Sequence, residues 1–414
     1  MLHAVSEAWL TWSKKVKARL FGLANAQEIR QVRRELERVL QQAAQEQEPG
    51  ALPLIDPSTL SDADKVICDR IANETKRYNR NNVTRTQAYW ESYRQHPELH
   101  WSLLAHMVSR NGGYNMTDLQ GELLPRVMEK GECERFFHFL ERPNYLIFGD
   151  AYPQLRLYAA SKERGRPLFH LLPFFGVSRF MRVIWERFWE TGDSQLLTLA
   201  LVVNEQNVIE KRVVQHKHYA AVVESFEFQA QTLLNLTQVV FPFRDVTKTP
   251  DPQLAGVIVD SFTSLSERID TGRRLYAILF DRQEVHRGVL QWAEQTPHTG
   301  SRSDYWPHLY TPEHPSPPKT AAANKPGPYT PRVHKLALKQ GASPLYSPRL
   351  QDAWPDVEKP EAPERYDWCV SAEAAEELYP APASRHYNIT ALYGQTLMLI
   401  ERMAAVETWK DKRT

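Results

Sequence analysis

Residues 178–190 read SRFMRVIWERFWE, and the spacing of their apolar residues decides the fold class. A period near 3.6 residues gathers side chains on one face of a helix, whereas a half-buried strand alternates apolar and polar residues. The large apolar side chains of this stretch recur every three or four positions, at Phe180, Val183, Ile184, Phe188 and Trp189. The stretch therefore predicts an amphipathic helix whose apolar face packs into a core.

Outward from this stretch, helical patterns fill most of the chain, and strand signals are scarce. One β-prone run at 239–243 contains Pro242, which favours a buried loop there. A chain of helices with short connections predicts an all-α protein, built as an irregular or orthogonal multi-helix bundle. The expected helices span approximately 84–95, 97–110, 117–127, 132–141, 145–162, 178–190, 193–215, 219–236, 252–268 and 272–294.

Two of these boundaries rest on local signals. Asn111-Gly112-Gly113 is expected to end a helix, because glycine readily adopts the left-handed conformation of a helix C-terminus. Thr117, with Gln120 three residues later, resembles a capping box and is expected to begin the next helix.

Composition divides the chain into five parts. They are an N-terminal helical segment (1–48), a linker (49–57), a main helical domain (58–295), a proline-rich strap (296–386) and a C-terminal helix that packs on the main domain (387–410). Proline removes a backbone donor and fixes φ, so the strap cannot be regular helix for long. Aromatic residues nevertheless recur through it, and we expect them to anchor an extended segment to the helices. These aromatic residues are Tyr305, Trp306, Tyr310, Tyr346, Trp354, Tyr366 and Trp368.

The first 21 residues combine an apolar stripe with basic residues. The stripe consists of Leu2, Val5, Trp9, Trp12, Val16 and Leu20, and the basic residues are Lys14, Lys15, Lys17 and Arg19. A helix of this kind can rest on a membrane surface. The alternative is a helix that docks on its own protein or on a partner. The sequence favours docking, because much of the polar face is uncharged.

Charge and cysteine usage exclude several classes of protein. The 51 Lys and Arg residues nearly balance the 50 Asp and Glu residues, so no whole-chain field attracts nucleic acid or an anionic membrane. The three cysteines, Cys68, Cys133 and Cys369, form no C-x-x-C pair, which argues against a disulfide framework and a cysteine zinc site. No apolar run is long enough to span a bilayer. We expect a cytoplasmic protein with no metal and no cofactor.

Two loops rich in arginine and asparagine are the candidate ligand-binding region. Arginine offers a fixed fork of donors, asparagine both donates and accepts, and Gly112 and Gly113 allow close backbone approach. Such loops suit a phosphate or a carboxylate, but they equally suit an internal network that caps helices. The candidate ligand-binding residues are Arg80, Asn82, Arg85, Arg110, Asn111 and Asn115.

Three residues are candidates for catalysis. Asp150 and Glu205 each adjoin an apolar run, so each carboxylate needs a partner or takes a raised pKa. A general base in a cleft is one interpretation, and an Arg–carboxylate pair with Arg85 or Arg110 is the favoured one. His106 lies among apolar neighbours, where a histidine is more often a core residue than a ligand.

The same loops carry a resemblance to a known family, the uncharacterised YppC-like proteins of bacilli. It covers about residues 60–285 and implies a Gram-positive cytoplasmic protein, with no catalytic residue to carry over. The similar motifs are NRNNVTRT (79–86), HW (100–101), AHMVSRNGG (105–113), NMTD (115–118), FLER (139–142), DAYPQL (150–155) and NEQ (204–206).

Three functional hypotheses follow. The favoured one is a helical binding or scaffold protein for an unknown protein partner, whose Arg and Asn residues form an internal network. The second is an enzyme or binding domain for an anionic small molecule, gripped by the same residues. The third is nucleic-acid binding, which lacks the usual excess of basic residues.

Overall fold

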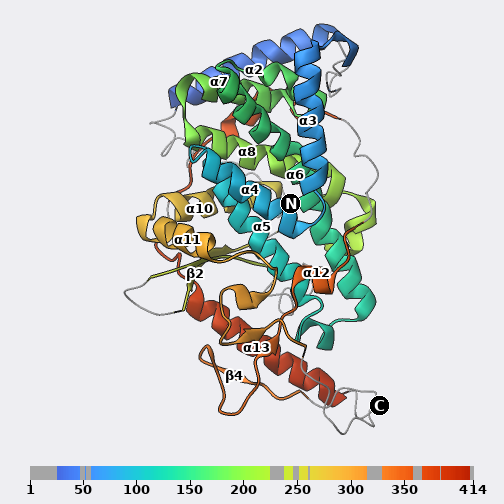
Figure 1. Ribbon diagram of the computed structural model, residues 1–414, viewed down its shortest axis with the longest axis vertical. Helices are drawn as coiled ribbons and strands as arrows, with labels where there is room; N and C mark the ends of the chain where they lie inside the picture. Colours follow the sequence, from blue (N-terminus) through green and yellow to red (C-terminus); the bar gives the residue numbers. More distant parts are fainter. Residues whose placement is uncertain are drawn as a thin grey trace, which may run out of the picture.

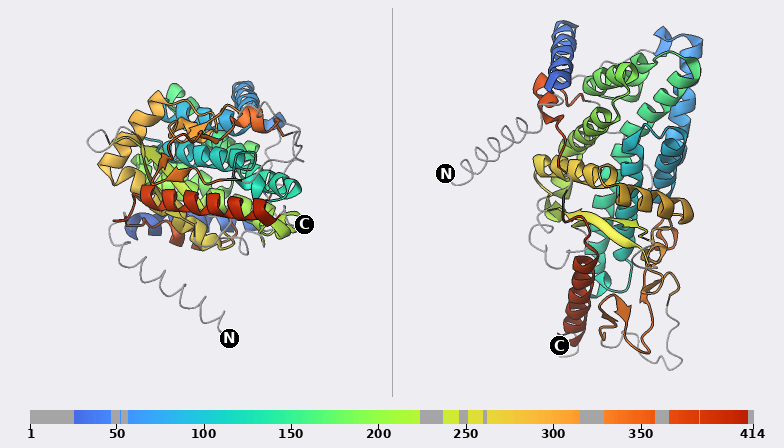
Figure 2. Two further views of the ribbon diagram at one scale, coloured as in Figure 1. Left: turned by 90° about the horizontal axis from the view of Figure 1, so that it is seen from below. Right: turned by 90° about the vertical axis from the view of Figure 1, so that its left-hand side faces the viewer.

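A computed structural model describes residues 26–46, 52, 57–223, 237–245, 251–259, 262–314, 329–357, 366–382 and 384–410. It is an all-α irregular bundle with an extended strap and a C-terminal helix (Figure 1). The molecule is elongated, with α2 at one end and α13 at the other (Figures 1 and 2). The α-helices are α2 (Ala26–Glu46), α3 (Asp62–Tyr78), α4 (Asn82–Gln95), α5 (His100–Asp118), α6 (Lys130–Arg164), α7 (Arg179–Thr191), α8 (Ser194–Ile209), α10 (Leu265–Phe280), α11 (Gln283–Gln295), α12 (Leu350–Ala353) and α13 (Thr390–Lys410).

Helix α7 confirms the prediction made from residues 178–190. The Ser178 hydroxyl accepts a hydrogen bond from the Met181 amide, which caps the first turn. Gly192 ends the helix in the left-handed conformation, with φ of 66°. The apolar face packs on α8, whose side chains are buried from Leu196 to Asn204, and α8 forms the centre of the bundle.

Helix α5 is longer than the sequence predicts, because Asn111, Gly112 and Gly113 continue it rather than end it. Glycine here admits close neighbours instead of a turn. A Cβ atom at Gly113 would lie 2.6 Å from Nε2 of His298 and closer still to Oδ1 of Asn82. The predicted helix from Thr117 is also wrong, because α5 ends at Asp118 and turns follow.

Helix α6 joins two predicted helices into one and contains Pro143 and Pro153. Proline lacks an amide hydrogen, so each ring breaks one bond of the helix. The carbonyls that lose a donor are those of Phe139 and Gly149, and the residue after each proline adds a side-chain bond to the next carbonyl along the helix. The side-chain amide of Asn144 donates to the Leu140 carbonyl at 2.8 Å, and that of Gln154 donates to the Asp150 carbonyl at 3.0 Å.

The predicted buried loop at 239–243 is instead a strand, β1 (Gln238–Phe243), paired antiparallel with β2 (Gln253–Ile258). The partner lies in a stretch that the sequence analysis assigned wrongly to a helix at 252–268. Asn111 holds the other edge of β1, since its Oδ1 accepts from the Val240 amide at 3.0 Å. Pro242 is tolerated because β1 has only one strand partner in the described hairpin.

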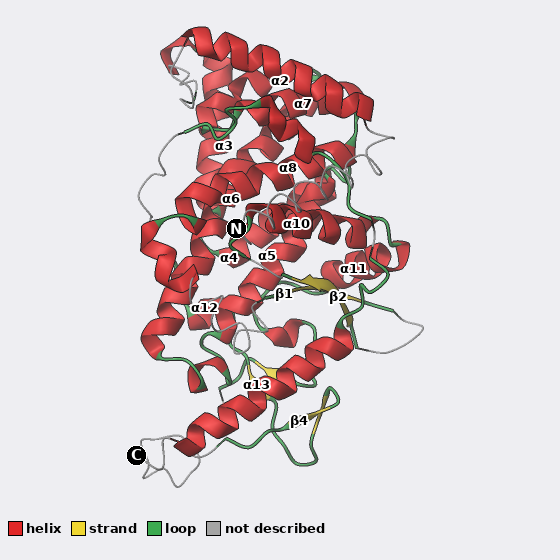
Figure 3. Cartoon of the chain, turned by 180° about the vertical axis from the view of Figure 1, so that it is seen from behind, coloured by secondary structure: helices red, strands yellow, loops and turns green. Residues whose placement is uncertain are grey.

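The strap lies along the helices and contains short elements (Figure 3). Of the seven aromatic residues expected to anchor the strap, Tyr305, Trp306 and Tyr310 are buried, and Tyr346, Trp354, Tyr366 and Trp368 are partly buried. These short elements are η6 (Arg302–Asp304), β3 (Tyr310–Thr311) paired parallel with β6 (Leu345–Tyr346), β4 (Val333–His334) paired antiparallel with β5 (Ala337–Leu338), and η7 (Ala372–Glu377).

Helix α13 receives the strap through the buried carboxylate of Glu401. This carboxylate accepts hydrogen bonds from the Tyr329 hydroxyl at 2.6 Å and from the Arg332 and Val333 amides at 2.7 and 2.9 Å. Residue 388 also pairs with Ala255, so the start of α13 adjoins β2. The strap is therefore tied to the protein by side-chain bonds as well as by apolar packing.

The structure does not test every prediction made from the sequence. The amphipathic segment 1–21 and most of the predicted helix at 219–236 lie outside the described residues. The division into five parts stays a prediction. Among the described helices, none has both the length and the apolar content that crossing a membrane requires.

The two adjacent glycines of α5 give a matched test of this packing. Gly113→Ala should destabilise the fold by about 1–3 kcal/mol, because the added methyl group collides with buried neighbours. Gly112→Ala should leave stability unchanged or raise it by up to about 1 kcal/mol, since its added Cβ atom would be 3.6 Å from the nearest atom, Nδ2 of Asn144, and alanine favours helix. Urea unfolding measures both, and equal effects would contradict the proposed close packing.

Candidate functional site

The first candidate, Arg85, forms a buried ion pair with Glu141 of α6. Its Nη1 donates to Oε2 of Glu141 at 2.9 Å, its Nη2 donates to Oε1, and both side chains are at most 8% exposed. The Arg85 Nε donates to Oδ1 of Asn79 at 2.7 Å, and the Asn79 amide donates to the Tyr145 carbonyl. The guanidinium thus joins α4 to α6 with both fork positions occupied.

The second candidate, Asn82, lies fully buried between α5 and the start of the strap. Its Nδ2 donates to the Ser109 carbonyl at 2.8 Å, which fixes the orientation of the amide. Its Oδ1 therefore accepts from Nε2 of His298 at 2.9 Å, so this ring nitrogen carries a proton. The other nitrogen, Nδ1, faces Oδ2 of Asp304 at 3.5 Å. Burial lowers the pKa of His298, although Asp304 opposes that effect.

Arg110 lies beside the same carboxylate. Its Nη2 donates to the Thr296 carbonyl at 2.8 Å and lies 3.9 Å from Oδ2 of Asp304, and its guanidinium stacks 4.1 Å from the Trp292 ring centre. Tyr114 donates its hydroxyl to Asp304 at 3.2 Å. Burial alone would raise the pKa of Asp304, but His298 and Arg110 lower it below its ordinary value.

A third group of bonds continues along α5 toward its C-terminus. Arg302 of the strap donates through Nε and Nη2 to both carboxylate oxygens of Asp118, at 2.6–2.9 Å. The same guanidinium donates to Oδ1 of Asn115 at 3.1 Å and to the Tyr305 hydroxyl at 2.7 Å. We call these three groups of bonded side chains together the α5–strap network. Its members are Arg85, Glu141, Asn82, His298, Arg110, Asp304, Tyr114, Arg302, Asp118 and Asn115.

The remaining candidates are also engaged by the protein. Asn111 holds β1, as described above, and donates from Nδ2 to the Gln238 carbonyl at 3.3 Å. Arg80 is 57% exposed and pairs with Asp356 at 2.9 Å. His106 is buried, with Nδ1 2.9 Å from the Thr86 carbonyl, and burial together with Arg110 holds the pKa of His106 well below its ordinary value.

In the described part of the chain, the hydrogen-bond donors to the two candidate bases, Asp150 and Glu205, are neutral side chains. Asp150 accepts through Oδ2 from the Asn204 amide at 2.6 Å and from the Gln154 amide at 2.8 Å. Glu205 accepts from the Trp101 indole and from the Gln206 amide, both at 3.2 Å. Burial raises the pKa of Asp150 to about 7 and that of Glu205 to about 8, because the donors are neutral.

The favoured pairing of these carboxylates with Arg85 or Arg110 is therefore wrong. The two arginines find partners that sequence reasoning missed, namely Glu141 and Asp304. The sequence carries a signal for Asp304, because this residue lies in the unusually polar and aromatic stretch GSRSDYWP (300–307). Glu141 had no comparable signal, because it lies in an ordinary amphipathic helix.

The arrangement limits what chemistry the candidates can perform. Arg85, Arg110, Asp150 and Glu205 do not converge on one pocket, and their polar atoms bind protein groups. Within the described residues, no three His, Cys, Asp or Glu side chains are arranged to hold a metal ion. The geometry suits a structural role, in which the polar groups fix the helices and the strap in register.

A double-mutant cycle tests the buried pair. Arg85→Met or Glu141→Met alone should cost about 3–5 kcal/mol of unfolding free energy, because each leaves an uncompensated buried charge. The double variant should cost clearly less than the sum. The exposed pair Arg182–Glu186, at 3.0 Å, is the matched control, with an expected coupling of about 0.3–0.5 kcal/mol. Equal couplings in the two cycles would contradict the structural role.

The raised pKa of Asp150 predicts a pH dependence of stability. The folded protein keeps this proton up to about pH 7, whereas an unfolded aspartate loses it near pH 4, so ionisation of Asp150 removes stability as pH rises through this window. Asp150→Asn cannot ionise and keeps an oxygen for both amide donors. Its stability relative to the unsubstituted chain should rise by up to about 1.4 kcal/mol per pH unit between about 4 and 7. Urea unfolding across this range measures it, and a pH-independent difference would contradict it.

Comparison with known proteins assigns this chain to a family. Residues 77–395 match the family described as "Protein of unknown function (DUF2515)", which covers α4, α5, α6 and most of the strap. The chain is 41% identical over 239 residues to "Uncharacterized protein YppC" of Bacillus subtilis (strain 168), a match that spans 58% of this chain and 72% of that protein. No solved structure matches the chain. The resemblance seen in the loop motifs is thus confirmed, and the chain belongs to the DUF2515 family of YppC-like proteins.

Proposed function

We propose that this chain is a helical binding or scaffold protein, in which the α5–strap network is internal architecture rather than a ligand site. The main support for this proposal is that the candidate side chains are already hydrogen-bonded to other groups of the protein. Arg85 is bonded to Glu141, and Arg110 is bonded to the Thr296 carbonyl. Asn82 is bonded to the Ser109 carbonyl and to His298. An anion would have to displace buried bonds of this kind, and each unsatisfied buried group costs about 1–3 kcal/mol.

The network also supports this proposal through the elements that it connects. Its bonds join α4 to α6, and they join both α4 and α5 to the strap. A rigid, elongated body with a fixed strap offers a large and constant outer surface for partners (Figure 1). As part of the same proposal, we place the protein in the cytoplasm, since its three buried cysteines are unpaired and suit a reducing compartment.

A thermal-shift titration tests the proposal against an anionic small-molecule site. Inorganic phosphate, ATP and citrate should give no saturable rise in melting temperature. A true ligand at about 100 times its Kd would add about 2.7 kcal/mol to the unfolding free energy. A saturable rise that is lost in Arg80→Gln, the most exposed candidate, would contradict the proposal and favour the anion-binding hypothesis.

A further inference from the structure

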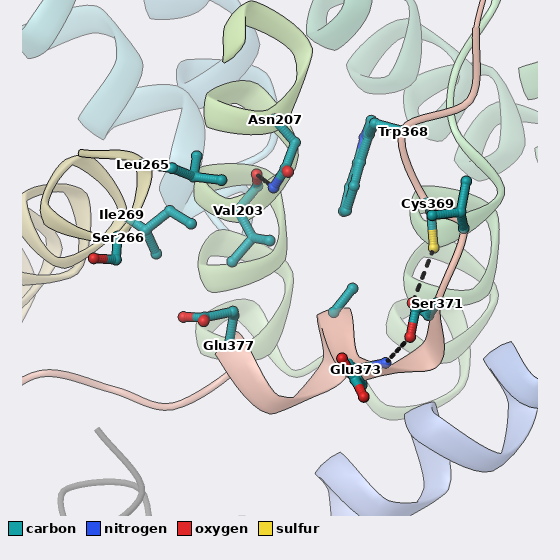
Figure 4. Close-up of a pocket in the computed structure, with 12 residues that line it drawn as sticks. Val203, Asn207, Leu265, Ser266, Ile269, Trp368, Cys369, Ser371, Glu373 and Glu377 are labelled. Carbon is teal, nitrogen blue, oxygen red and sulfur yellow. Dashed lines mark hydrogen bonds between the residues drawn. The ribbon is translucent and has the colours of Figure 1, made fainter. Parts of the chain in front are cut away.

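A groove of about 360 Å³ lies between α8, α10 and the end of the strap, away from the α5–strap network. Figure 4 shows the Trp368 ring on one side of the groove, with Val203, Leu265 and Ile269 opposite. Ala374 of η7 also lines the groove. The lining is therefore largely apolar, with room for a large side chain.

The Trp368 wall of the groove is held firmly. Its indole Nε1 donates to Oδ1 of Asn204 at 2.8 Å, and its ring packs 5.1 Å from that of Phe180. The preceding residue, Asp367, accepts from the backbone amide and the Nη1 of Arg179, at 3.1 and 2.9 Å. These bonds fix the wall in place, so the groove is formed before anything occupies it.

The groove also exposes apolar surface next to negative charge. Val370 also lines the groove, and 65% of its surface is exposed. Glu373 and Glu377 complete the lining on the η7 side (Figure 4). Glu377 pairs with Arg273 at 2.7 Å, whereas Glu373 forms no ion pair within the described part of the chain. An apolar segment with basic residues would complement this surface.

The start of α2 brings such a segment close. Helix α2 packs on η7, and Arg33 donates to Glu376 of η7 at 2.8 Å. Ala26, the first residue of α2, is seven residues from Arg33, or about 10 Å along a helix. Residues 22–25 can span about 13 Å when extended. The chain that precedes residue 22 is thus tethered within reach of the groove.

We propose that residues 1–21 occupy this groove in the same molecule, with Trp9 and Trp12 against Trp368 and Ile269. Their apolar stripe supplies the large side chains that the groove can take. Lys14, Lys15, Lys17 and Arg19 supply positive charge beside Glu373 and Glu377. Apolar burial is the main attraction, because a tryptophan buries about 150–250 Å² whereas exposed ion pairs contribute little.

The short connection to α2 favours binding of residues 1–21 in the groove of the same molecule over their binding to a second copy of the chain or to a membrane. A connection of only four residues gives an effective concentration on the order of millimolar, far above the protein concentration in dilute solution. A weak contact in the groove is then sufficient to keep residues 1–21 bound. The proposal goes beyond the scaffold function and does not depend on it, because no residue of the α5–strap network lines the groove.

Cysteine cross-linking in the full chain tests the proposal. Ser13→Cys places a thiol beside Trp12, and Val370→Cys places one at the groove. The matched control replaces Val370→Cys by Val66→Cys on α3, since Val66 is 67% exposed. The native thiols stay protonated at pH 7, because burial raises the pKa of Cys68, Cys133 and Cys369 to about 12, about 11 and about 12.

A short bifunctional maleimide should link the Ser13→Cys and Val370→Cys pair at least about tenfold more than the control pair, within one chain and independently of protein concentration. Ala374→Trp, which fills the groove, should abolish the difference. Trp9→Ala with Trp12→Ala should also abolish the difference, and this variant leaves the groove itself unchanged, so it tests the proposal even where Ala374→Trp impairs folding. Equal yields for the two pairs, or links only between two chains, would overturn the proposal.

Discussion

The carboxylate of Asp304 is the contact on which the attachment of the strap depends. It accepts bonds from the Thr299 amide and hydroxyl at 3.0 and 2.6 Å, which close the turn, and from Tyr114 of α5. It also faces Arg110 and His298. A buried charge is tolerated only with such partners, so the turn and α5 stabilise each other through this carboxylate. The strand pairs described in the proline-rich strap, β3 with β6 and β4 with β5, have only two residues per strand and supply little of this order.

Much of the helical body was predictable, because helix formation follows a local apolar period and local caps. Residues 178–190 illustrate this, since Ser178 and Gly192 bound α7 close to where the sequence predicts. The hairpin was not predictable. Strand β1 finds its partner beyond a loop, in a run whose apolar residues suit a helix equally well. Gly113 was misinterpreted for a related reason, since glycine also serves where a distant side chain must approach the backbone.

The candidate site shows the same limit. The sequence identified Asn82, Arg85 and Arg110 as polar residues that need partners. It did not identify the partners, which lie 56 residues away for Arg85 and 216 for Asn82. Local patterns carry no information about such pairings, which depend on how the helices and the strap pack together. The type of interaction was therefore predictable, and the topology that completes it was not.

The protein contains two kinds of buried carboxylate, and the difference has a structural consequence. Glu141 and Asp304 face cations, whereas Asp150 is bonded by neutral amides and takes a raised pKa. Asn204 donates to Asp150 and accepts from Trp368, so a continuous chain of bonds connects this carboxylate to the groove wall. Protonated Asp150 suits that chain, because the Asn204 amide then has no buried charge to compensate. The position of the groove wall is thus linked, through Asn204, to a carboxylate that does not line the groove.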